Sequence, residues 1–564
     1  MIKLTGKKER KLRKAQRAQY RKDEAASKKE ENKRRREQNR IKRPPLRGWS
    51  FRGGGASGVV QPFDEWRGST RQVCGIWPFG IGTGTPMIGV PLGRHIFSGA
   101  TLCCDPISWF QRANLISNPS VFVLGKPGLG KSTVVRRMGT GLAGYGVLPL
   151  VLGDLKPDYV DMIKAQGGQV IKLGRGTGGY LNVLDPGESR EAAQRLRDGG
   201  FESQAQQLEA EAHGRRQTMV SALISIMRAE APTDREETII DRSLKWLDEH
   251  HEGVPVLGDL LKVVQEAPQE VRAVALDRGD DQRYKEITEN LEATLIGLTS
   301  GGRLGETFAR QTTNPMRRDR PVVYDVSGID DSDLDLQAAT LLACWSAGFG
   351  TVAVAHALAE AGLEPQRHYF VILDELWRAL RAGRGMVDRV DALTRLNRQR
   401  GVGLAMLSHT MSDLLALPSE EERMKAKGFV ERSGMVVLGG LPSEEMPQLT
   451  RALPLSEAEQ ALLAGWQDPP AWDAKSGREA EPPGRGKFLV KVGGRPGIPI
   501  KVLLTRTELE INDTNKLWHE QSRVGDDHEE TPPLTDAQEA EAAAALEVVE
   551  ELSDVNTEEL EHTS

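Results

Sequence analysis

The stretch VFVLGKPGLGKSTVV, residues 121–135, decides the fold of this chain. It opens with four apolar residues that predict a buried strand, and it closes with two valines that begin a helix. Between them, Gly125, Gly130, Lys131 and Ser132 match the pattern Gly-x-x-x-x-Gly-Lys-Ser/Thr of a phosphate-binding loop, the Walker A motif. The strand, loop and helix together predict a nucleotide site.

The chemistry explains these residue types. A triphosphate is a dense anion that backbone N–H groups must surround, and glycine lets the backbone approach it closely. The helix that begins near Lys131 adds the positive end of its dipole. We expect Lys131 to reach the β- and γ-phosphates and the Ser132 hydroxyl to bind Mg²⁺. The predicted nucleotide-binding residues are Gly125, Lys126, Pro127, Gly128, Leu129, Gly130, Lys131, Ser132 and Thr133.

A second motif follows far along the chain. The apolar run 369–373 leads directly into Asp374 and Glu375, as in a Walker B motif. Such carboxylates, at the end of a strand beside the phosphate loop, can hold the metal and polarise the attacking water. We assign Asp374 to the metal and Glu375 to the general base. The alternative is a strand that ends in two acidic residues with no role in chemistry.

Further strands and helices alternate along the chain. Strand patterns occur at 146–154, around 169–173, at 321–326 and again ahead of Ser408. This alternation predicts an α/β fold of the P-loop, RecA-like kind, with a mostly parallel sheet covered by helices on both faces. Residues 188–297 are helical in pattern and predict an all-α insertion between two strands.

The region between residues 336 and 359 raises the question of a membrane span. It has 24 residues without a formal charge, which is long enough to cross a bilayer. However, it is rich in Ala, Gly, Ser and Thr and lies between two strands of the same predicted sheet. We therefore predict a buried core helix and no transmembrane span.

Charge is concentrated at the two ends of the 564 residues. Basic residues exceed acidic ones by thirteen in residues 1–43, whereas residues 525–564 contain fourteen acids and no Lys or Arg. No apolar segment follows the basic start, so no signal peptide is indicated. Cys74, Cys103, Cys104 and Cys344 show no metal or disulfide spacing, which fits a reducing cytoplasm. The basic end is either a solubilising tail or an arm that touches nucleic-acid phosphates or lipid headgroups.

These features divide the chain into six expected regions. They are a basic arm that is helical or disordered (1–45), a linker with a small β-rich segment (46–110), the first part of the P-loop core (111–187), the all-α insertion (188–297), the second part of the core with C-terminal elements (298–520), and an acidic, disordered tail (521–564).

The order of the motifs resembles one family. After the phosphate loop come GDLKPDYVDMIKAQGGQVIKLG, YLNVLDP, VVYDVSGI, ILDELW and LSHT. This succession, over about residues 86–509, resembles the ATPase domain of the VirB-four type, the conjugative type IV secretion ATPases in the HerA/FtsK branch of P-loop motors. The order of the motifs carries the resemblance, because those after the phosphate loop are weak one by one.

The resemblance implies further site residues. Asp154 and Tyr159 look like the family's strand-end acid and aromatic, and Asp158 replaces its usual Glu. The family's Asn-x-x-Asp turn falls on Asn182 and Asp185, and another strand-end Asp falls on Asp325.

Two more catalytic positions follow from the resemblance. Arg398 matches the arginine of the family's Arg-Lys pair, with Gln399 in place of the lysine, and is expected to act on a neighbouring subunit's nucleotide. Arg303, Arg400 and Arg432 compete for that role. His409 stands where the family has a γ-phosphate-sensing Gln; its charge would vary with pH, and a polar strand end is the alternative.

The resemblance implies an ATP- and Mg²⁺-dependent motor of a conjugation or secretion apparatus that assembles as a hexamer. Its partners would be membrane-channel components, and its location the cytoplasm at the inner face of the membrane. Only about 120 residues precede the phosphate loop here, whereas the family usually has several hundred. The chain resembles the motor half alone, so a separate docking subunit is expected. Alternatives are a HerA/FtsK-like or coupling-protein DNA translocase and a nucleotide-gated scaffold with little hydrolysis.

Overall fold

The computed structural model describes residues 22, 25–30, 32–34, 84–174, 176–300, 304–381, 386–394, 401–469, 472–473, 478–479 and 481–511. The chain divides into two units, Met1–Ile81 and Gly82–Ser564. In the first unit, the described residues are helical and exposed. The expected acidic tail and most of the expected basic arm lie outside the described residues. The boundary between the two units, at residue 81, lies inside the expected segment 46–110. From residue 87 onward, this segment pairs with the sheet of the second unit.

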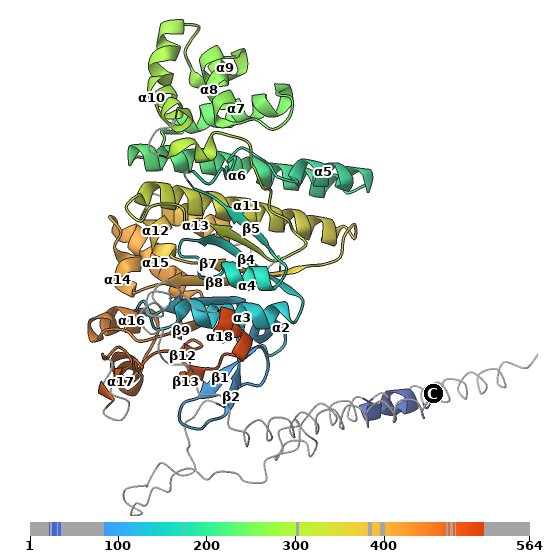
Figure 1. Cartoon of the computed structure of the whole chain (residues 1–564). Helices are drawn as coiled ribbons and strands as arrows, with labels where there is room; N and C mark the ends of the chain where they lie inside the picture. Colours follow the sequence, from blue (N-terminus) through green and yellow to red (C-terminus); the bar gives the residue numbers. More distant parts are fainter. Residues whose placement is uncertain are drawn as a thin grey trace, which may run out of the picture. The chain divides into compact units, whose positions relative to one another are not determined.

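Among the described residues, the second unit is built on a sheet of eleven strands (Figure 1). Their order is β2-β1-β13-β12-β9-β3-β8-β7-β4-β6-β5, and a separate pair joins β10 to β11. The bounds are β1 Pro91–His95, β2 Thr101–Cys103, β3 Ser120–Leu124, β4 Val147–Asp154, β5 Gln169–Lys172, β6 Val322–Asp325, β7 His368–Leu373, β8 Val402–Ser408, β9 Met435–Leu438, β10 Trp472–Asp473, β11 Arg478–Glu479, β12 Lys487–Lys491 and β13 Ile498–Val502.

The sheet changes character along its width. From β9 to β5, every neighbouring pair of strands is parallel. From β9 through β12, β13 and β1 to β2, every pair is antiparallel. The prediction of a mostly parallel α/β sheet is therefore confirmed. The antiparallel extension lies beyond the strand of the phosphate loop, and residues near both ends of the second unit form it.

Alternation of side chains explains why helices cover both faces. In β3, Val121 and Val123 pack on one face while Phe122 and Leu124 pack on the other, and all four are buried. The first face carries α2 (Pro106–Gln111), α3 (Lys131–Ala143) and α4 (Val160–Ala165). The second face carries α11 (Leu334–Glu360), α12 (Leu376–Leu380), α13 (Met386–Thr394), α14 (Met411–Leu415) and α15 (Glu420–Glu431).

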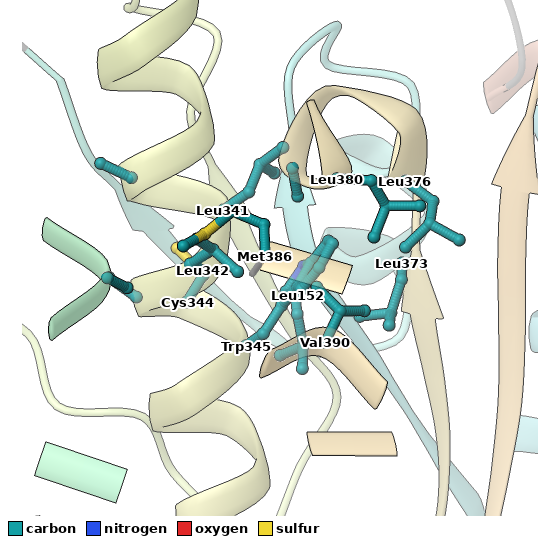
Figure 2. Packing of buried hydrophobic residues seen from close by; sticks show 14 of the residues in the cluster. Leu152, Leu341, Leu342, Cys344, Trp345, Leu373, Leu376, Leu380, Met386 and Val390 are labelled. Carbon is teal, nitrogen blue, oxygen red and sulfur yellow. The ribbon is translucent and has the colours of Figure 1, made fainter. Parts of the chain in front are cut away.

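Helix α11 forms the centre of the second face. Among the described residues it is the one helix long and apolar enough to cross a membrane, but 83% of its most apolar window is buried inside the structure. Figure 2 shows its Leu341, Leu342 and Trp345 beside Leu152 of β4 and residues of α12 and α13. Gly348 allows the close approach, because a Cβ there would lie 2.5 Å from both methyl groups of Leu152. The helix is thus placed as a core helix, as the sequence predicted.

Between β5 and β6 the described elements are almost entirely helical. They are α5 Ser189–Asp198, α6 Glu202–Arg228, α7 Asp234–His250, α8 Leu257–Glu266, α9 Gln269–Ala275, α10 Asp281–Thr299 and a short 3-10 helix at Gly305–Phe308. Helices α5 and α6 pack on α11, and α7 to α10 lie beyond α6 (Figure 1). The helical region is therefore attached to the core through α11. Within this region, Thr233 and Glu236 form a capping box that begins α7.

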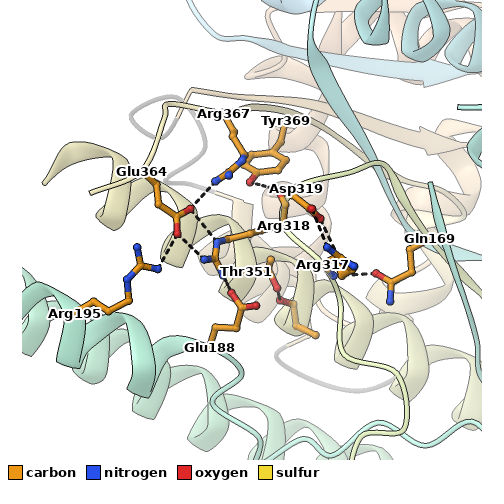
Figure 3. Close-up of polar contacts among 11 residues, drawn as sticks. Gln169, Glu188, Arg195, Arg317, Arg318, Asp319, Thr351, Glu364, Arg367 and Tyr369 are labelled. Atoms are coloured by element: carbon orange, nitrogen blue, oxygen red, sulfur yellow. Dashed lines mark hydrogen bonds and ion pairs between the residues drawn. The ribbon is translucent and has the colours of Figure 1, made fainter. Parts of the chain in front are cut away.

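A cluster of ion pairs joins this helical region to the sheet (Figure 3). The Glu364 carboxylate accepts hydrogen bonds from Arg318 at 2.6 Å, Arg195 at 2.8 Å and Arg367 at 2.7 Å. Arg318 also pairs with Glu188. Arg195 belongs to α5, Arg367 precedes β7, and Arg318 precedes β6. The carboxylate thus holds three separate segments together.

Within its described residues, the C-terminal part of the second unit adds three α-helices: α16 Met446–Ala452, α17 Glu457–Gly465 and α18 Arg506–Ile511. Helix α18 is attached to α3 by an ion pair between Glu508 and Arg137 at 2.7 Å. The helix that carries the phosphate loop is therefore fastened to the far end of the described chain.

Candidate functional site

The phosphate loop leaves β3 at its carboxyl end and enters α3 at Lys131. Gly128 and Gly130 adopt φ angles of +80° and +100°, which L side chains rarely do. Gly125 lies against another backbone, since a Cβ there would be 3.1 Å from the Gly439 Cα. The sequence Gly-x-x-x-x-Gly-Lys-Ser thus folds as the strand, loop and helix that its pattern predicts.

The sheet order brings the other motifs to this loop. Strands β8 and β9 flank β3, and β7 lies beside β8, all of them parallel. Parallel strands end at the same edge of a sheet, so the residues that follow them meet there. The Gly125 N–H donates to the His409 carbonyl at 3.0 Å, and the Lys126 N–H donates to the Gly440 carbonyl at 3.1 Å. The loop is therefore held from both sides by neighbouring strand ends.

Three candidate catalytic side chains form a continuous chain of contacts. The Lys131 ammonium lies 2.9 Å from His409 Nδ1, and His409 Nε2 lies 3.3 Å from Glu375 Oε2. An ammonium group only donates, so Nδ1 accepts and the ring proton is placed on Nε2, facing the carboxylate. A neutral His409 therefore connects Lys131, the candidate phosphate ligand, to Glu375, the candidate base.

Burial and charge explain the ionisation of this chain. Burial, and then the neighbouring Lys131 charge, lower the pKa of His409 to about 4. Burial also lowers the pKa of Lys131, although the carboxylates of Asp374 and Glu375 oppose that change. His409 is consequently uncharged near neutral pH, as the contact with Lys131 requires.

Asp374 lies at the end of β7 beside a second strand end. Its Oδ2 accepts a hydrogen bond from the Tyr159 hydroxyl at 3.0 Å. Burial, and then the charge of Glu375, raise the pKa of Asp374 above its ordinary range. Asp154, at the end of β4, accepts the N–H groups of Tyr159 at 2.8 Å and Asp158 at 3.1 Å. Asp154 therefore orients Tyr159, and Tyr159 holds the candidate metal ligand.

The donor set fits Mg²⁺ only together with a nucleotide. Among the described residues, no cluster of three His, Cys, Asp or Glu side chains could hold a metal by itself. Mg²⁺ in such sites takes few protein oxygens and completes its shell with phosphate oxygens and water. The Ser132 hydroxyl and the Asp374 carboxylate are oxygen donors of the required kind. They follow β3 and β7, the two strands that flank β8.

The residues carried over from the family divide into two groups. Asp154 and Tyr159 join the site as described. Asn182 instead donates to the Pro255 carbonyl at 2.9 Å, and Asp185 accepts from Thr312 at 3.1 Å. Asp325 accepts from the Ser327 hydroxyl at 2.6 Å. These hydrogen bonds thus hold other loops in place. None of the partners named here belongs to the phosphate loop.

The trans-acting arginine stays a prediction. Arg398 lies outside the described residues, as do Arg303 and Arg400. Arg432, a further candidate, pairs with Asp391 of the same chain at 2.8 Å.

Two features of the site were missed from the sequence. One is the glycine pair Gly439–Gly440 after β9, which backs the phosphate loop. The sequence pattern that could have indicated this pair is an apolar strand ending in two glycines. The other is Trp377, whose indole Nε1 donates to Glu375 Oε2. The signal was a tryptophan two residues after the second acid of the motif.

Comparisons with known proteins give the following. No protein-family model matches the chain, and no curated protein matches it. The structure of VirB4 of Thermoanaerobacter pseudethanolicus matches with a TM-score of 0.50 and 17% identity, over 76% of this chain and 100% of that chain. The plasmid coupling protein TrwB in complex with ADP and Mg²⁺ matches with a TM-score of 0.43 and 12% identity, over 76% and 97%. The cytoplasmic domain of the type VII secretion ATPase EccC of Thermomonospora curvata matches with a TM-score of 0.27 and 14% identity, over 73% and 28%.

At 17% identity, the likeness to VirB4 shows the fold. The chain shares the α/β fold of that protein, as the resemblance in the sequence led us to expect.

Proposed function

We propose that this chain is the ATP-hydrolysing motor of a bacterial conjugation or type IV secretion system. One observation carries the proposal: Lys131, at the phosphate loop, is joined through His409 to Glu375, which follows Asp374 at the end of β7. The proposed phosphate ligand, metal ligand and base thus follow β3 and β7, the two strands that flank β8, as expected of a P-loop motor. The choice of secretion system rests on the order of motifs and on the fold shared with VirB4.

Each residue has a definite task in the reaction. The backbone N–H groups of the phosphate loop and Lys131 bind the phosphates, so Lys131 exchanges His409 for a phosphate oxygen. Ser132 and Asp374 would hold Mg²⁺, and the ion would supply positive charge against the charge that develops on the phosphates. Glu375 accepts a proton from the water that attacks the γ-phosphorus; the bond to the β,γ-bridging oxygen breaks, and ADP and phosphate form. His409 is the proposed γ-phosphate sensor. Its one N–H, on Nε2, faces Glu375 in this structure, so the ring must turn before it can donate toward the γ-phosphate.

Assembly would complete the site. P-loop motors of this branch work as rings, in which a neighbour supplies an arginine to the transferred phosphate. We assign that role to Arg398 and the ring to a hexamer. Channel components at the inner face of the membrane, with a separate docking subunit, are the proposed partners.

Two substitutions test the proposal. Lys131→Ala should abolish turnover and weaken ATP binding, because it removes the phosphate ligand. Glu375→Gln should bind ATP with unchanged affinity but stop hydrolysis, because an amide cannot take up the proton. Turnover is measured by phosphate release and binding with a fluorescent ATP analogue. Lys164→Ala, an exposed lysine on α4, is the matched control and should change neither. Wild-type turnover in Glu375→Gln would remove Glu375 from the mechanism.

A DNA translocase is the second candidate, and the thirteen excess positive charges of residues 1–43 favour it. Duplex and single-stranded DNA are added to the ATPase assay at fixed, moderate salt. A steep rise in turnover with DNA would favour the translocase, whereas a rate that does not change with DNA would favour the secretion motor.

A nucleotide-gated scaffold is the third candidate, motivated by His409 between Lys131 and Glu375. Absence of turnover in the assembled protein would favour it.

A further inference from the structure

Trp377 lies in the first turn after the candidate base, and the proposed mechanism gives it no task. It follows Glu375 by two residues and belongs to α12. Its indole Nε1–H donates a hydrogen bond to Glu375 Oε2. The indole ring also lies 6.1 Å from the His409 ring, centroid to centroid. Trp377 therefore lies against two members of the candidate catalytic chain, Glu375 and His409.

The backbone at Glu375 explains how these contacts arise. Glu375 has a φ angle of +50°, a left-handed conformation that is strained for a residue with a side chain. Its N–H donates to Asp374 Oδ1 at 2.8 Å. This turn places the Glu375 carboxylate over the start of α12, within reach of the indole. A strained residue that is held by surrounding groups is typical of a functional site.

The two oxygens of Glu375 have different surroundings. Oε2 accepts the Trp377 indole N–H and lies 3.3 Å from His409 Nε2, which carries the ring proton in the tautomer that Lys131 requires. Among the described residues, the hydrogen bonds and ion pairs of this carboxylate all involve Oε2. The Glu375 side chain is 12% exposed. Oε2 is thus the anchored oxygen, and within the described part of the chain Oε1 has no hydrogen bond or ion pair.

Trp377 is itself held in place by cationic groups. The guanidinium carbon of Arg378 lies 5.0 Å from the indole centroid, and that of Arg381 lies 5.3 Å from it. Arg378 in turn donates to Gln337 of α11. Gln337 is 1% exposed and also donates to the Asp330 carbonyl at 3.1 Å. The indole therefore has a fixed support that does not depend on a bound nucleotide.

We infer that Trp377 is a positioning residue for the general base: its indole N–H anchors Glu375 Oε2, so that Oε1 faces the attacking water and receives its proton. The inference rests on the proposed function, because it assumes that Glu375 acts as the base. Among the described residues, the polar and ring contacts of the indole are with Glu375, His409, Arg378 and Arg381, none of them in the phosphate loop, so it would act on the rate of hydrolysis through Glu375. A carboxylate with both oxygens free to rotate spends less time in the reactive orientation.

The substitution Trp377→Phe removes the N–H and keeps a ring for both arginines. It should lower kcat about tenfold, which corresponds to one net hydrogen bond in the transition state. The KM for ATP and the affinity for the fluorescent ATP analogue should stay within twofold, since no phosphate ligand changes. Trp246→Phe is the matched control: Trp246 stacks on His250 in α7, away from the site, and its loss should leave kcat unchanged.

A double variant separates positioning from a general structural role. In the Glu375→Gln background, Trp377→Phe should not lower the small residual rate any further, measured in single turnovers over long times, because there is no base left to position. An additional tenfold loss there, a wild-type kcat in Trp377→Phe, or a change confined to KM would each overturn the inference. Should Trp377→Phe fail to bind nucleotide, Trp377→His is compared with Trp377→Leu, and equal rates would overturn it.

The same series distinguishes this inference from the proposed function. If wild-type protein does not hydrolyse ATP, or if Glu375→Gln hydrolyses it normally, the proposed function fails. If wild-type protein turns over and Glu375→Gln does not, while Trp377→Phe equals wild type, only the role of Trp377 fails.

Discussion

At the scale of the residue, the protonation of His409 links catalysis to stability. Its pKa of about 4 in the folded chain lies below the ordinary value of 6.5. Between these two values the unfolded chain binds a proton that the folded chain does not, so the free energy of unfolding falls as pH decreases through this window. The loss between pH 7 and pH 5 amounts to about 2 kcal/mol for this one group.

Urea unfolding of wild type and His409→Gln at both pH values checks this prediction. The variant lacks the titrating ring, so wild-type protein should lose about 2 kcal/mol more than the variant on acidification. His250→Gln, at the exposed end of α7, should instead behave as wild type. Equal losses of unfolding free energy in wild type and His409→Gln would show that the folded protein does not hold the ring neutral.

The residue scale also shows what the sequence could reveal about the site. The roles proposed for Lys131 and Asp374 followed from motifs, because each motif is local and its chemistry is fixed by residue type. The bonds of His409 to Lys131 and Glu375 join residues far apart in the chain, and only the sheet order brings them together. Trp377 was missed because a tryptophan after a strand is more often a core residue than a hydrogen-bond donor to a base.

At the scale of the element, Glu364 connects three segments by accepting hydrogen bonds from three arginines. The neighbouring Arg318 guanidinium holds the pKa of Glu364 well below its usual range. Glu364→Gln removes the charge and leaves Arg195, Arg318 and Arg367 without that partner. The free energy of unfolding should fall by about 3 kcal/mol, as for other broken, largely buried ion pairs.

Glu360→Gln is the matched control for this prediction. Glu360 lies near the end of α11, and its carboxylate is 60% exposed. Its loss should change the unfolding free energy by less than about 0.5 kcal/mol. Equal effects of the two substitutions in urea unfolding would show that Glu364 does not hold the segments together.

The packing of α11 on β4 gives a second prediction at this scale. In Gly348→Ala, the new Cβ would meet the two methyl groups of Leu152, which is fully buried and cannot swing away. We expect a loss of about 2 kcal/mol in unfolding free energy. In Gly214→Ala, on α6, the new Cβ meets nothing within 4 Å, so the better helix former should add about 0.5–1 kcal/mol. Thermal unfolding of both variants checks these predictions: the unfolding midpoint should fall in Gly348→Ala and rise in Gly214→Ala. A shift in the same direction in both variants would contradict them.

Sequence reasoning at this scale succeeded where the pattern was local. The apolar runs of β3, β4, β6, β7 and β8 and the helical periodicity of the region after β5 were readable because each depends on neighbours in the chain. The antiparallel pairing joins β12 to β9 across 51 residues (Leu489 with Leu438) and β1 to β13 across 409 (Gly93 with Val502), and the sequence holds no periodic signal for either contact.

At the scale of the whole molecule, a shared catalytic site makes turnover depend on assembly. If a neighbour supplies Arg398, the ATPase rate per subunit should rise with protein concentration until the ring is complete. The rate is measured over a wide dilution series together with the molecular mass in solution. Arg398→Ala should keep ATP binding and assembly but lose most of the turnover. A rate per subunit that stays constant upon dilution to monomers would contradict the shared site.

The pairing of β1 with β13 also has a mechanical consequence. The strands are antiparallel, and the Leu503 N–H donates to the Leu92 carbonyl at 3.2 Å, so the chain enters β1 beside the place where it leaves β13. A force that pulls these two points apart would load the hydrogen bonds of the ladder one at a time, as in the opening of a zipper. Tension would therefore peel β1 from β13 at low force, while the strands beside the phosphate loop stay folded.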